Sequence, residues 1–312
     1  MLVEQELSRQ ASDTDTVITI GVFDGVHLGH RHLLNEVKRQ AQSLSCHSAV
    51  ITFRQHPEKL ISPGKELPYL TSLDERINRL KKEGIDSVVV LSFNYELAEI
   101  EARYFISLLK KYLHMVALVV GPDFALGKNR KGEPNYLREL GKEMGFTVSV
   151  VLPKIINGEI VSSTAIRKAL AQGDMKHVFV LAGKYFTLSG PVVTGVGRGR
   201  GLGYPTANLN VDDEQALPPD GVYATLAQID NKLYQSLTSI GVRPTFDNGN
   251  RTIEVFILDY AGNLYGKEIK VDFVERLRPE KKFDKAEDLQ KQIAEDIRIG
   301  KTILSKINNI GQ

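Results

Sequence analysis

The chain has 312 residues, enough for two domains of about 150 residues, and 42% apolar with 25% charged residues is the composition of a globular protein. Forty Lys and Arg against 38 Asp and Glu leave a net charge of +2, which argues against a broad nucleic-acid surface. The single cysteine, Cys46, excludes an internal disulfide and a cysteine-based metal site. The acidic N-terminal segment argues against a secretory signal, and no apolar stretch approaches the roughly 20 residues of a membrane helix. We therefore expect a cytoplasmic protein with neither a nucleic-acid nor a membrane partner.

Short apolar runs alternate with helical patterns between residues 16 and 183. Strands are predicted over 16–23, 48–53, 87–93, 115–121 and 146–152. Helices are predicted over 30–44, 101–113 and 134–145, and a capping box at Ser72 opens another. A hairpin at 154–161 precedes a helix that begins at 162–164. This βαβα order is typical of a parallel α/β sheet covered on both faces, which binds ligands beyond the carboxyl ends of its strands.

The pattern changes after Gly183. Strands are predicted over 185–194, 221–229, 233–240, 252–258 and 269–277, with turn signals between them that include 247–250. Short strands at this spacing predict an antiparallel barrel or sandwich, followed by one long helix over 286–307. We therefore divide the chain into domains 1–183 and 184–312.

The first candidate site lies where the first strand meets the first helix. Residues 21–30 read GVFDGVHLGH. Glycines there let the backbone approach a ligand, and the N–H groups at a helix start suit a phosphate. His27 and His30 could donate hydrogen bonds as charge builds at phosphorus. The alternative is that they are ordinary loop and helix residues, but their place at a strand-to-helix junction favours a functional role.

A second segment, SSTAIR at residues 162–167, starts a helix. By itself it is an ordinary helix cap, but it leaves Arg167 one turn into the helix, able to reach a phosphate. Together with residues 21–30 it predicts a nucleotide cradle built from two loops.

The third candidate site is in the C-terminal half. Residues 195–203 read GVGRGRGLG, which is neither a P-loop nor a dinucleotide fingerprint. They fit a basic flap over phosphates, or equally a mobile linker or an RNA-contacting segment. YPTAN follows at 204–208, and its Thr206 and Asn208 place two hard oxygen donors on one side of an extended segment, as Mg²⁺ requires. Glu254, a lone carboxylate in an apolar strand, is either a solvent-facing residue or a general base.

The N-terminal motifs resemble the nucleotidyltransferases marked by HxGH and ISSTxIR, and with TF at 52–53 and GPDF at 121–124 they resemble the FAD synthetase branch. The resemblance implies a Rossmann-like fold in which the FMN phosphate attacks ATP and pyrophosphate leaves. It implies that His27 and His30 are catalytic and that Asp123 and Phe124 lie near the FMN. The residues expected to contact ATP are Gly21, Phe23, Asp24, Gly29, Ser163, Thr164 and Arg167.

The C-terminal motifs resemble riboflavin kinase. They are the segment 199–208 with GVY at 221–223, RPT at 243–245, Glu254, LYG at 264–266 and LRPE at 277–280 with Phe283. The resemblance implies a small closed β-barrel with a C-terminal helix, which transfers the γ-phosphate of ATP to riboflavin. It assigns Glu254 as the general base and Thr206 and Asn208 to Mg²⁺. The residues expected to contact ATP here are Gly197, Arg200, Gly203 and Pro205.

The two resemblances follow one another over about residues 16–306, as in the bifunctional riboflavin kinase/FAD synthetase family. We therefore predict a two-step transferase with the substrates riboflavin, FMN and ATP and the cofactor Mg²⁺. Two alternatives stay open: an enzyme with only one active half, and a flavin or nucleotide sensor that consumes no ATP.

Overall fold

The computed structural model describes residues 1–62, 64, 67–195, 198–242 and 251–308. The chain divides into two compact units, Met1–Ser163 and Thr164–Gln312, which we call the sheet unit and the barrel unit. The domain boundary predicted at Gly183 falls directly after a helix of the barrel unit, and it stays a prediction. None of the described helices is long and apolar enough to cross a membrane.

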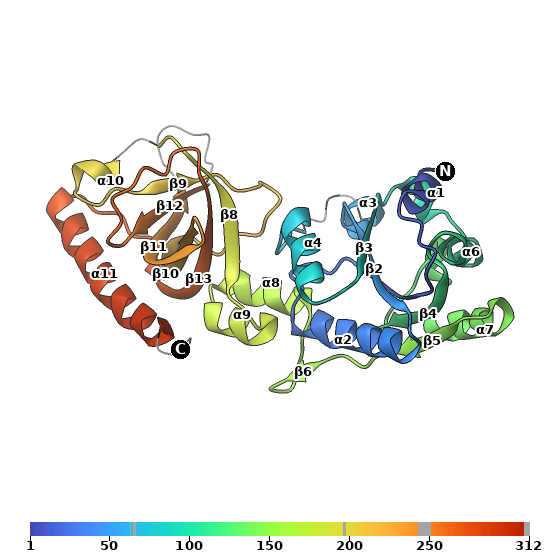
Figure 1. Ribbon diagram of the computed structural model, residues 1–312. Coiled ribbons are helices and arrows are strands. Elements are labelled where there is room, and N and C mark those ends of the chain that lie inside the picture. Colours follow the sequence, from blue (N-terminus) through green and yellow to red (C-terminus); the bar gives the residue numbers. More distant parts are fainter. Residues whose placement is uncertain (63, 65–66, 196–197, 243–250, 309–312) are drawn as a thin grey trace. The chain divides into compact units, whose positions relative to one another are not determined.

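The sheet unit contains a five-stranded parallel sheet in the order β3-β2-β1-β4-β5, which confirms the predicted α/β fold (Figure 1). Its strands are β1 (Thr16–Ile20), β2 (His47–Phe53), β3 (Ser87–Leu91), β4 (Met115–Val120) and β5 (Thr147–Val150). The chain runs outward from β1 to β3 and returns to the other side of β1 with β4. The carboxyl ends of β1 and β4 therefore form the topological switch point, where open α/β sheets bind their ligands.

Apolar side chains cover both faces of this sheet because successive residues of each strand point to opposite sides. Ile18 and Ile51 pack in the larger core cluster with residues of α1, α6 and α7, whereas Val17 and Ala117 pack against α2 on the other face. The helices of this unit are α1 (Leu2–Ser8), α2 (Leu28–Ser43), α3 (Pro57–Ile61), α4 (Leu73–Lys82), α5 (Tyr95–Ala98), α6 (Ala102–Leu113), η1 (Lys128–Arg130) and α7 (Pro134–Met144), followed by the hairpin β6 (Ile155–Ile156) and β7 (Glu159–Ile160). The Ser72 side chain caps α4 as predicted, accepting a hydrogen bond from the Glu75 N–H.

The barrel unit is a closed antiparallel barrel in the order β10-β11-β12-β9-β8-β13, which decides between the predicted barrel and sandwich. Its strands are β8 (Phe186–Val193), β9 (Ala207–Leu209), β10 (Gly221–Ile229), β11 (Lys232–Val242), β12 (Arg251–Ile257) and β13 (Glu268–Pro279). The short strand β9 was not predicted, and it closes the barrel by pairing with both β8 and β12.

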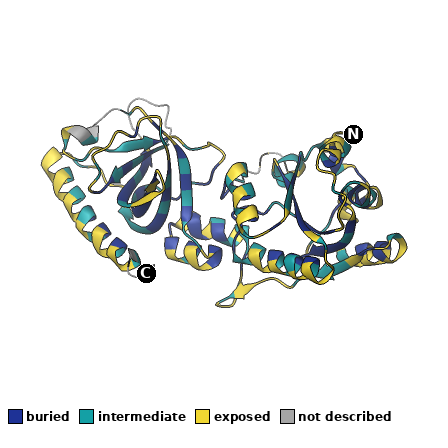
Figure 2. Cartoon of the chain, in the orientation of Figure 1, coloured by how far each residue is buried: buried dark blue, intermediate teal, exposed yellow. Residues whose placement is uncertain are grey.

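The helices that accompany the barrel in the described part of the chain are α8 (Ser163–Gln172), α9 (Met175–Ala182), α10 (Arg198–Gly201) and α11 (Ala286–Asn308). The long helix α11 was predicted, and it packs on the outside of the barrel through Leu304, which is fully buried against Ala224 and Val274. Its opposite face is exposed (Figure 2). The predicted turn at 247–250 and the RPT motif at 243–245 lie outside the described residues.

Candidate active sites

The loop after β1 has an unusual backbone. Phe23 and Val26 have positive φ angles of 54° and 42°, and Gly25 has a φ of 81°. Side chains disfavour this region, so neighbouring contacts must hold the loop in place. Gly21 lies at its start, and the Phe23 side chain is buried.

This loop delivers the two predicted catalytic histidines to one place. His27 is the N-cap of α2, where its Nδ1 accepts a hydrogen bond from the His30 N–H at 3.3 Å. The two imidazole rings stack with centroids 3.6 Å apart and planes 18° apart. The pair therefore stands at the N-terminus of a 16-residue helix and at the carboxyl end of β1, which is the place for a phosphate.

Gly29 is required by packing at this helix start. A Cβ atom there would lie 2.7 Å from the Val161 carbonyl oxygen and 3.1 Å from two atoms of the His27 ring. The glycine therefore lets the first turn of α2 lie directly against the segment that leads into α8.

The other residues predicted for adenylyl transfer have different surroundings. The Ser163 hydroxyl donates to the Asp24 carbonyl oxygen at 3.0 Å, so Ser163, the last residue of the sheet unit, contacts the loop after β1. Thr164 is exposed and Arg167 half-buried on α8, and since both belong to the barrel unit, their place beside the histidines stays a prediction. The carboxylate of Asp24, a residue also predicted to contact ATP, is buried and accepts hydrogen bonds from the backbone N–H groups of residues 70–71.

The predicted FMN residues follow β4, the strand beside β1. Asp123 is exposed, and its carbonyl oxygen accepts a hydrogen bond from Arg130 at 3.1 Å. Phe124 is half-buried and packs against the core cluster on one face of the sheet. Both residues thus lie at the switch point, on the opposite side from β2.

A cavity of about 630 Å³ in the barrel unit joins the kinase candidates. Thr206, Asn208 and Glu254 all line it. Asn208 of β9 lies opposite Glu254 on the adjacent strand β12, and the Thr206 hydroxyl donates to Oε2 of Glu254 at 3.3 Å. The carboxylate thus faces the cavity rather than open solvent. A hydroxyl, an amide and a carboxylate are hard oxygen donors, so this set fits Mg²⁺.

A second cavity, of about 460 Å³, adjoins the first at Thr206, which lines both. Pro205 and the side chains of Tyr260 and Tyr265 also line the second cavity, whereas Glu254 lines only the first. The first cavity has aromatic walls of its own in Tyr204, Phe256 and Phe283.

The remaining residues predicted to contact ATP belong to the segment 197–205. Pro205 and Gly203 are exposed, and Gly203 has a positive φ of 84°. Arg200 belongs to α10, and Gly197 lies outside the described residues. Contacts of these residues with ATP stay predictions.

Sequence reasoning missed a buried ion pair in the wall of the larger cavity. Both carboxylate oxygens of Asp296 on α11 accept from Arg278 on β13, at 2.8–3.0 Å, and Gln292 adds a further hydrogen bond at 3.0 Å. Glu280 lies beside them in the cavity lining, and partial burial, together with nearby carboxylates, raises its pKa. The LRPE motif marked Arg278 and Glu280 in the sequence, but nothing local pointed to Asp296.

Sequence reasoning also missed Arg76, which is 1% exposed. Its Nη1 donates to the carbonyl oxygens of Val22 at 2.8 Å and Phe53 at 3.1 Å, so it joins the ends of β1 and β2. Burial lowers the pKa of Arg76, although the nearby Asp24 carboxylate acts in the opposite direction.

Comparisons with known proteins identify a family for each half of the chain. Residues 9–165 match the family described as FAD synthetase, and residues 182–304 match riboflavin kinase. The chain is 32% identical over 300 residues to the bifunctional riboflavin kinase/FMN adenylyltransferase of Listeria monocytogenes, covering 96% of this chain and 95% of that protein. The corresponding protein of Escherichia coli K12 is 37% identical over 289 residues, or 92% of each chain.

A solved structure described as a macrolide-efflux protein from Streptococcus pneumoniae matches with a TM-score of 0.87 at 30% identity, covering 94% of this chain and 96% of that one. Two different domain families thus match in succession, and relatives containing both match along nearly their whole length. The chain is a member of the family of bifunctional riboflavin kinase/FMN adenylyltransferases.

Proposed function

We propose that the two activities of this transferase are divided between the two sites described above. The barrel unit phosphorylates riboflavin to FMN, and the stacked histidines of the sheet unit serve the transfer of AMP from ATP to FMN, which yields FAD and pyrophosphate. The observation that carries this division is the presence of two distinct polar centres, one in each compact unit: Glu254 with Thr206 and Asn208, and His27 with His30.

In the kinase site, Glu254 is the general base. It accepts the proton of the ribityl hydroxyl as that oxygen attacks the γ-phosphorus of ATP, and ADP leaves. Because Glu254 lines only the larger cavity, riboflavin occupies that cavity, between aromatic walls and α11. ATP then occupies the smaller cavity beside Tyr260 and Tyr265, and the two substrates meet at Thr206.

Thr206 and Asn208 hold Mg²⁺ in this proposal. A hydroxyl that donates its hydrogen to Glu254 keeps its lone pairs for a cation, so the observed hydrogen bond leaves Thr206 able to bind the metal. The bound ion neutralises phosphate charge during transfer. Gly197, Arg200, Gly203 and Pro205 are the proposed ATP contacts from the flanking loop.

In the adenylyltransferase site, a phosphate oxygen of FMN attacks the α-phosphorus of ATP, the bond to the β-phosphate breaks and pyrophosphate leaves. His27 and His30 donate hydrogen bonds to the phosphate oxygens as negative charge grows there, next to the positive end of α2. The proposed ATP contacts are Gly21, Phe23, Gly29, Ser163, Thr164 and Arg167. Asp123 and Phe124 contact the FMN.

We further propose that the functional domains divide near Gly183, at the start of the segment that matches riboflavin kinase and after the segment that matches FAD synthetase. Because both reactions consume ATP, we place the enzyme in the cytoplasm.

Two single substitutions test the division of labour. Glu254→Gln keeps the size of the side chain but removes the base, so FMN formation should fall about 10²–10⁴-fold. FAD formation from supplied FMN should be unchanged. His30→Ala should have the opposite pattern. Chromatography of the products made from riboflavin with Mg²⁺ and ATP, and from FMN with Mg²⁺ and ATP, separates the two steps.

The same assay decides between the alternatives. Equal loss of both activities in both variants would contradict the two-site assignment. Accumulation of FMN without any FAD by the unsubstituted enzyme would reject the adenylyltransferase site, and binding without ATP consumption would indicate a sensor.

A further inference from the structure

We propose that Asp24 and Thr71 form a clamp that positions His27 and His30, and that neither Asp24 nor Thr71 contacts substrate. This inference rests on the proposed role of the histidine pair. It assigns Asp24, which the sequence predicts to bind ATP, to the support of the loop instead.

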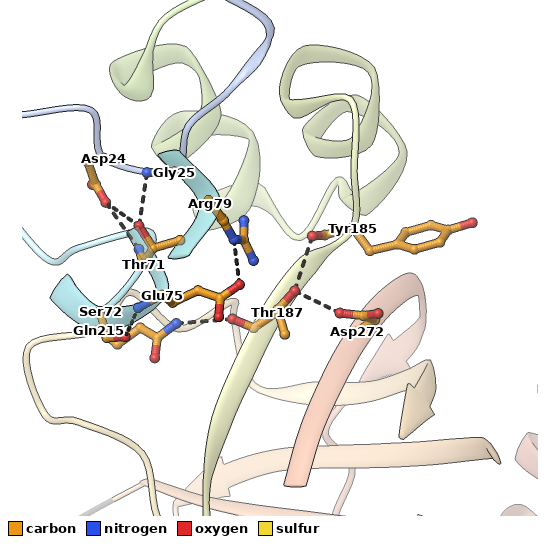
Figure 3. A network of polar contacts seen from close by, with 10 residues as sticks. All are labelled: Asp24, Gly25, Thr71, Ser72, Glu75, Arg79, Tyr185, Thr187, Gln215 and Asp272. Atoms are coloured by element: carbon orange, nitrogen blue, oxygen red, sulfur yellow. Dashed lines mark hydrogen bonds and ion pairs between the residues drawn. The ribbon is translucent and has the colours of Figure 1, made fainter. Parts of the chain in front are cut away.

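The carboxylate of Asp24 is committed to the protein itself. Its Oδ1 accepts from the backbone N–H of Thr71 at 3.1 Å and from the Thr71 hydroxyl at 3.3 Å (Figure 3). The backbone N–H of Leu70 also donates to Oδ1 at 3.0 Å and to Oδ2 at 2.9 Å. Asp24 is 2% exposed. A carboxylate so buried and so surrounded by donors has no open side for a magnesium ion or a nucleotide.

The contact runs in both directions between the two segments. The backbone N–H of Gly25 donates to the Thr71 hydroxyl oxygen at 3.1 Å, so the Thr71 hydroxyl accepts from the loop and donates to Asp24 (Figure 3). Gly25 and Asp24 precede Thr71 by 46 and 47 residues in the chain. The clamp therefore ties the loop after β1 to the segment that leads into α4.

The loop needs such a tie because its backbone is strained. Phe23 and Val26, on either side of Asp24 and Gly25, have positive φ angles of 54° and 42°. Phenylalanine and the β-branched valine avoid this conformation, which persists only where surrounding contacts impose it. The clamp supplies those contacts at the middle of the strained stretch, and the Ser163 hydroxyl adds one at the Asp24 carbonyl oxygen.

The strained stretch sets the position of both imidazoles. His27 directly follows Val26 and caps α2. The Phe23 ring lies 5.1 Å from the His30 ring, centroid to centroid, and His30 stacks on His27. A relaxation of Phe23 and Val26 would therefore shift both rings, and displacements of about 1 Å at a reacting centre cost on the order of 10²-fold in rate.

The test compares Thr71→Val, which keeps the shape of the side chain but removes the hydroxyl, with Thr71→Ser, which keeps the hydroxyl. Thr71→Val should lower kcat for FAD formation from FMN about 10–100-fold, with the KM for ATP changed less than about threefold. Thr71→Ser should retain kcat within about threefold, because the hydroxyl still exchanges both hydrogen bonds. Riboflavin kinase activity, which depends on the barrel unit, checks the rest of each protein.

Asp24→Asn completes a double-mutant cycle with Thr71→Val. Both changes loosen the same clamp, so the doubly substituted enzyme should be about as slow as the worse single variant. A selective rise in the KM for Mg²⁺-ATP in Asp24→Asn, with Thr71→Val unaffected, would overturn the proposal and make Asp24 a substrate ligand. Loss of ATP binding in Thr71→Val, measured by calorimetry, would indicate that Thr71 maintains the folded structure and does not position the histidines. This result would also reject the proposal.

His30→Ala separates failure of the clamp from failure of the proposed function. If His30→Ala loses FAD formation while Thr71→Val does not, the clamp alone is wrong. If His30→Ala retains FAD formation, the proposed site itself is wrong.

Discussion

The ion pair between Arg278 and Asp296 is predicted to hold α11 against the barrel, and Asp296→Ala is the change that tests it. Asp296 is 4% exposed, and three hydrogen bonds from Arg278 at 2.8–3.0 Å reach its two oxygens. The substitution removes the carboxylate and leaves the guanidinium without its anionic partner.

The expected loss of stability follows from the burial of both groups. Breaking a fully buried pair from one side costs about 3–5 kcal/mol. The Arg278 side chain is 18% exposed, so water screens the abandoned charge in part. We therefore expect the low end of this range, about 3 kcal/mol, for unfolding of the barrel unit.

Asp296→Ala should also alter the binding of riboflavin in the larger cavity. Leu289, Ile293 and Ile297 of α11 line it, so a loosened helix should raise the KM for riboflavin while FAD formation from FMN is unchanged. Unfolding by urea, followed through kinase activity, measures the stability. Glu295→Ala is the matched control, because this neighbour on α11 forms a surface ion pair with Arg298.

Two results would refute this reasoning. One is an Asp296→Ala enzyme that behaves like Glu295→Ala. The other is a double variant, Arg278→Met with Asp296→Leu, that is less stable than Asp296→Ala, since removing both charges should recover part of the loss.

Two further predictions concern the kinase cavity. A Cβ atom at Gly195 would lie 2.0 Å from Nδ2 of Asn208, so Gly195→Ala should displace that amide, slow FMN formation and raise the Mg²⁺ concentration that the reaction requires. Gly201→Ala is the control, because no atom lies within 4 Å of the added carbon, and it should change neither property. An equal effect of the two substitutions would contradict the metal role of Asn208. The pKa of Glu280 is raised by partial burial, so its contribution to stability is complete below the unfolded-state pKa and is lost as the pH rises through the folded-state value. Glu280→Gln should therefore be more stable than the unsubstituted enzyme at pH 8, and its advantage in stability should be smaller at pH 4. The midpoints of urea unfolding at the two pH values measure this advantage. A larger advantage at pH 4 would contradict a raised pKa of Glu280 in the folded enzyme.

The local patterns of the sequence were sufficient for most of the fold. Periodicity placed the five parallel strands within a few residues, and the strand at 221–229 was placed with the bounds observed for β10. Helix α9 and strand β9 were missed, because α9 is apolar on nearly every side and β9 has only three residues. Neither carries the periodic contrast between polar and apolar residues on which such predictions depend.

The candidate sites were predictable to the same extent. The motifs that hold His27 and His30 and those that hold Thr206 and Asn208 are short and continuous, so these candidates can be named from the sequence alone. Their surroundings cannot. Asp24 finds its donors 46 and 47 residues away at Leu70 and Thr71, so the burial of its carboxylate depends on a segment that is distant in the chain.

The sequence by itself therefore indicated most of the elements and their order, and it supplied the candidate site residues. Only the tertiary structure decided the strand order that puts β4 beside β1, the closure of the barrel through β9, and the pairing of Asp296 with Arg278. The physical reason is the separation along the chain of the residues that interact. Helix and strand preferences arise between residues a few positions apart, whereas burial of a charge and pairing of strands depend on which distant segments meet when the core closes.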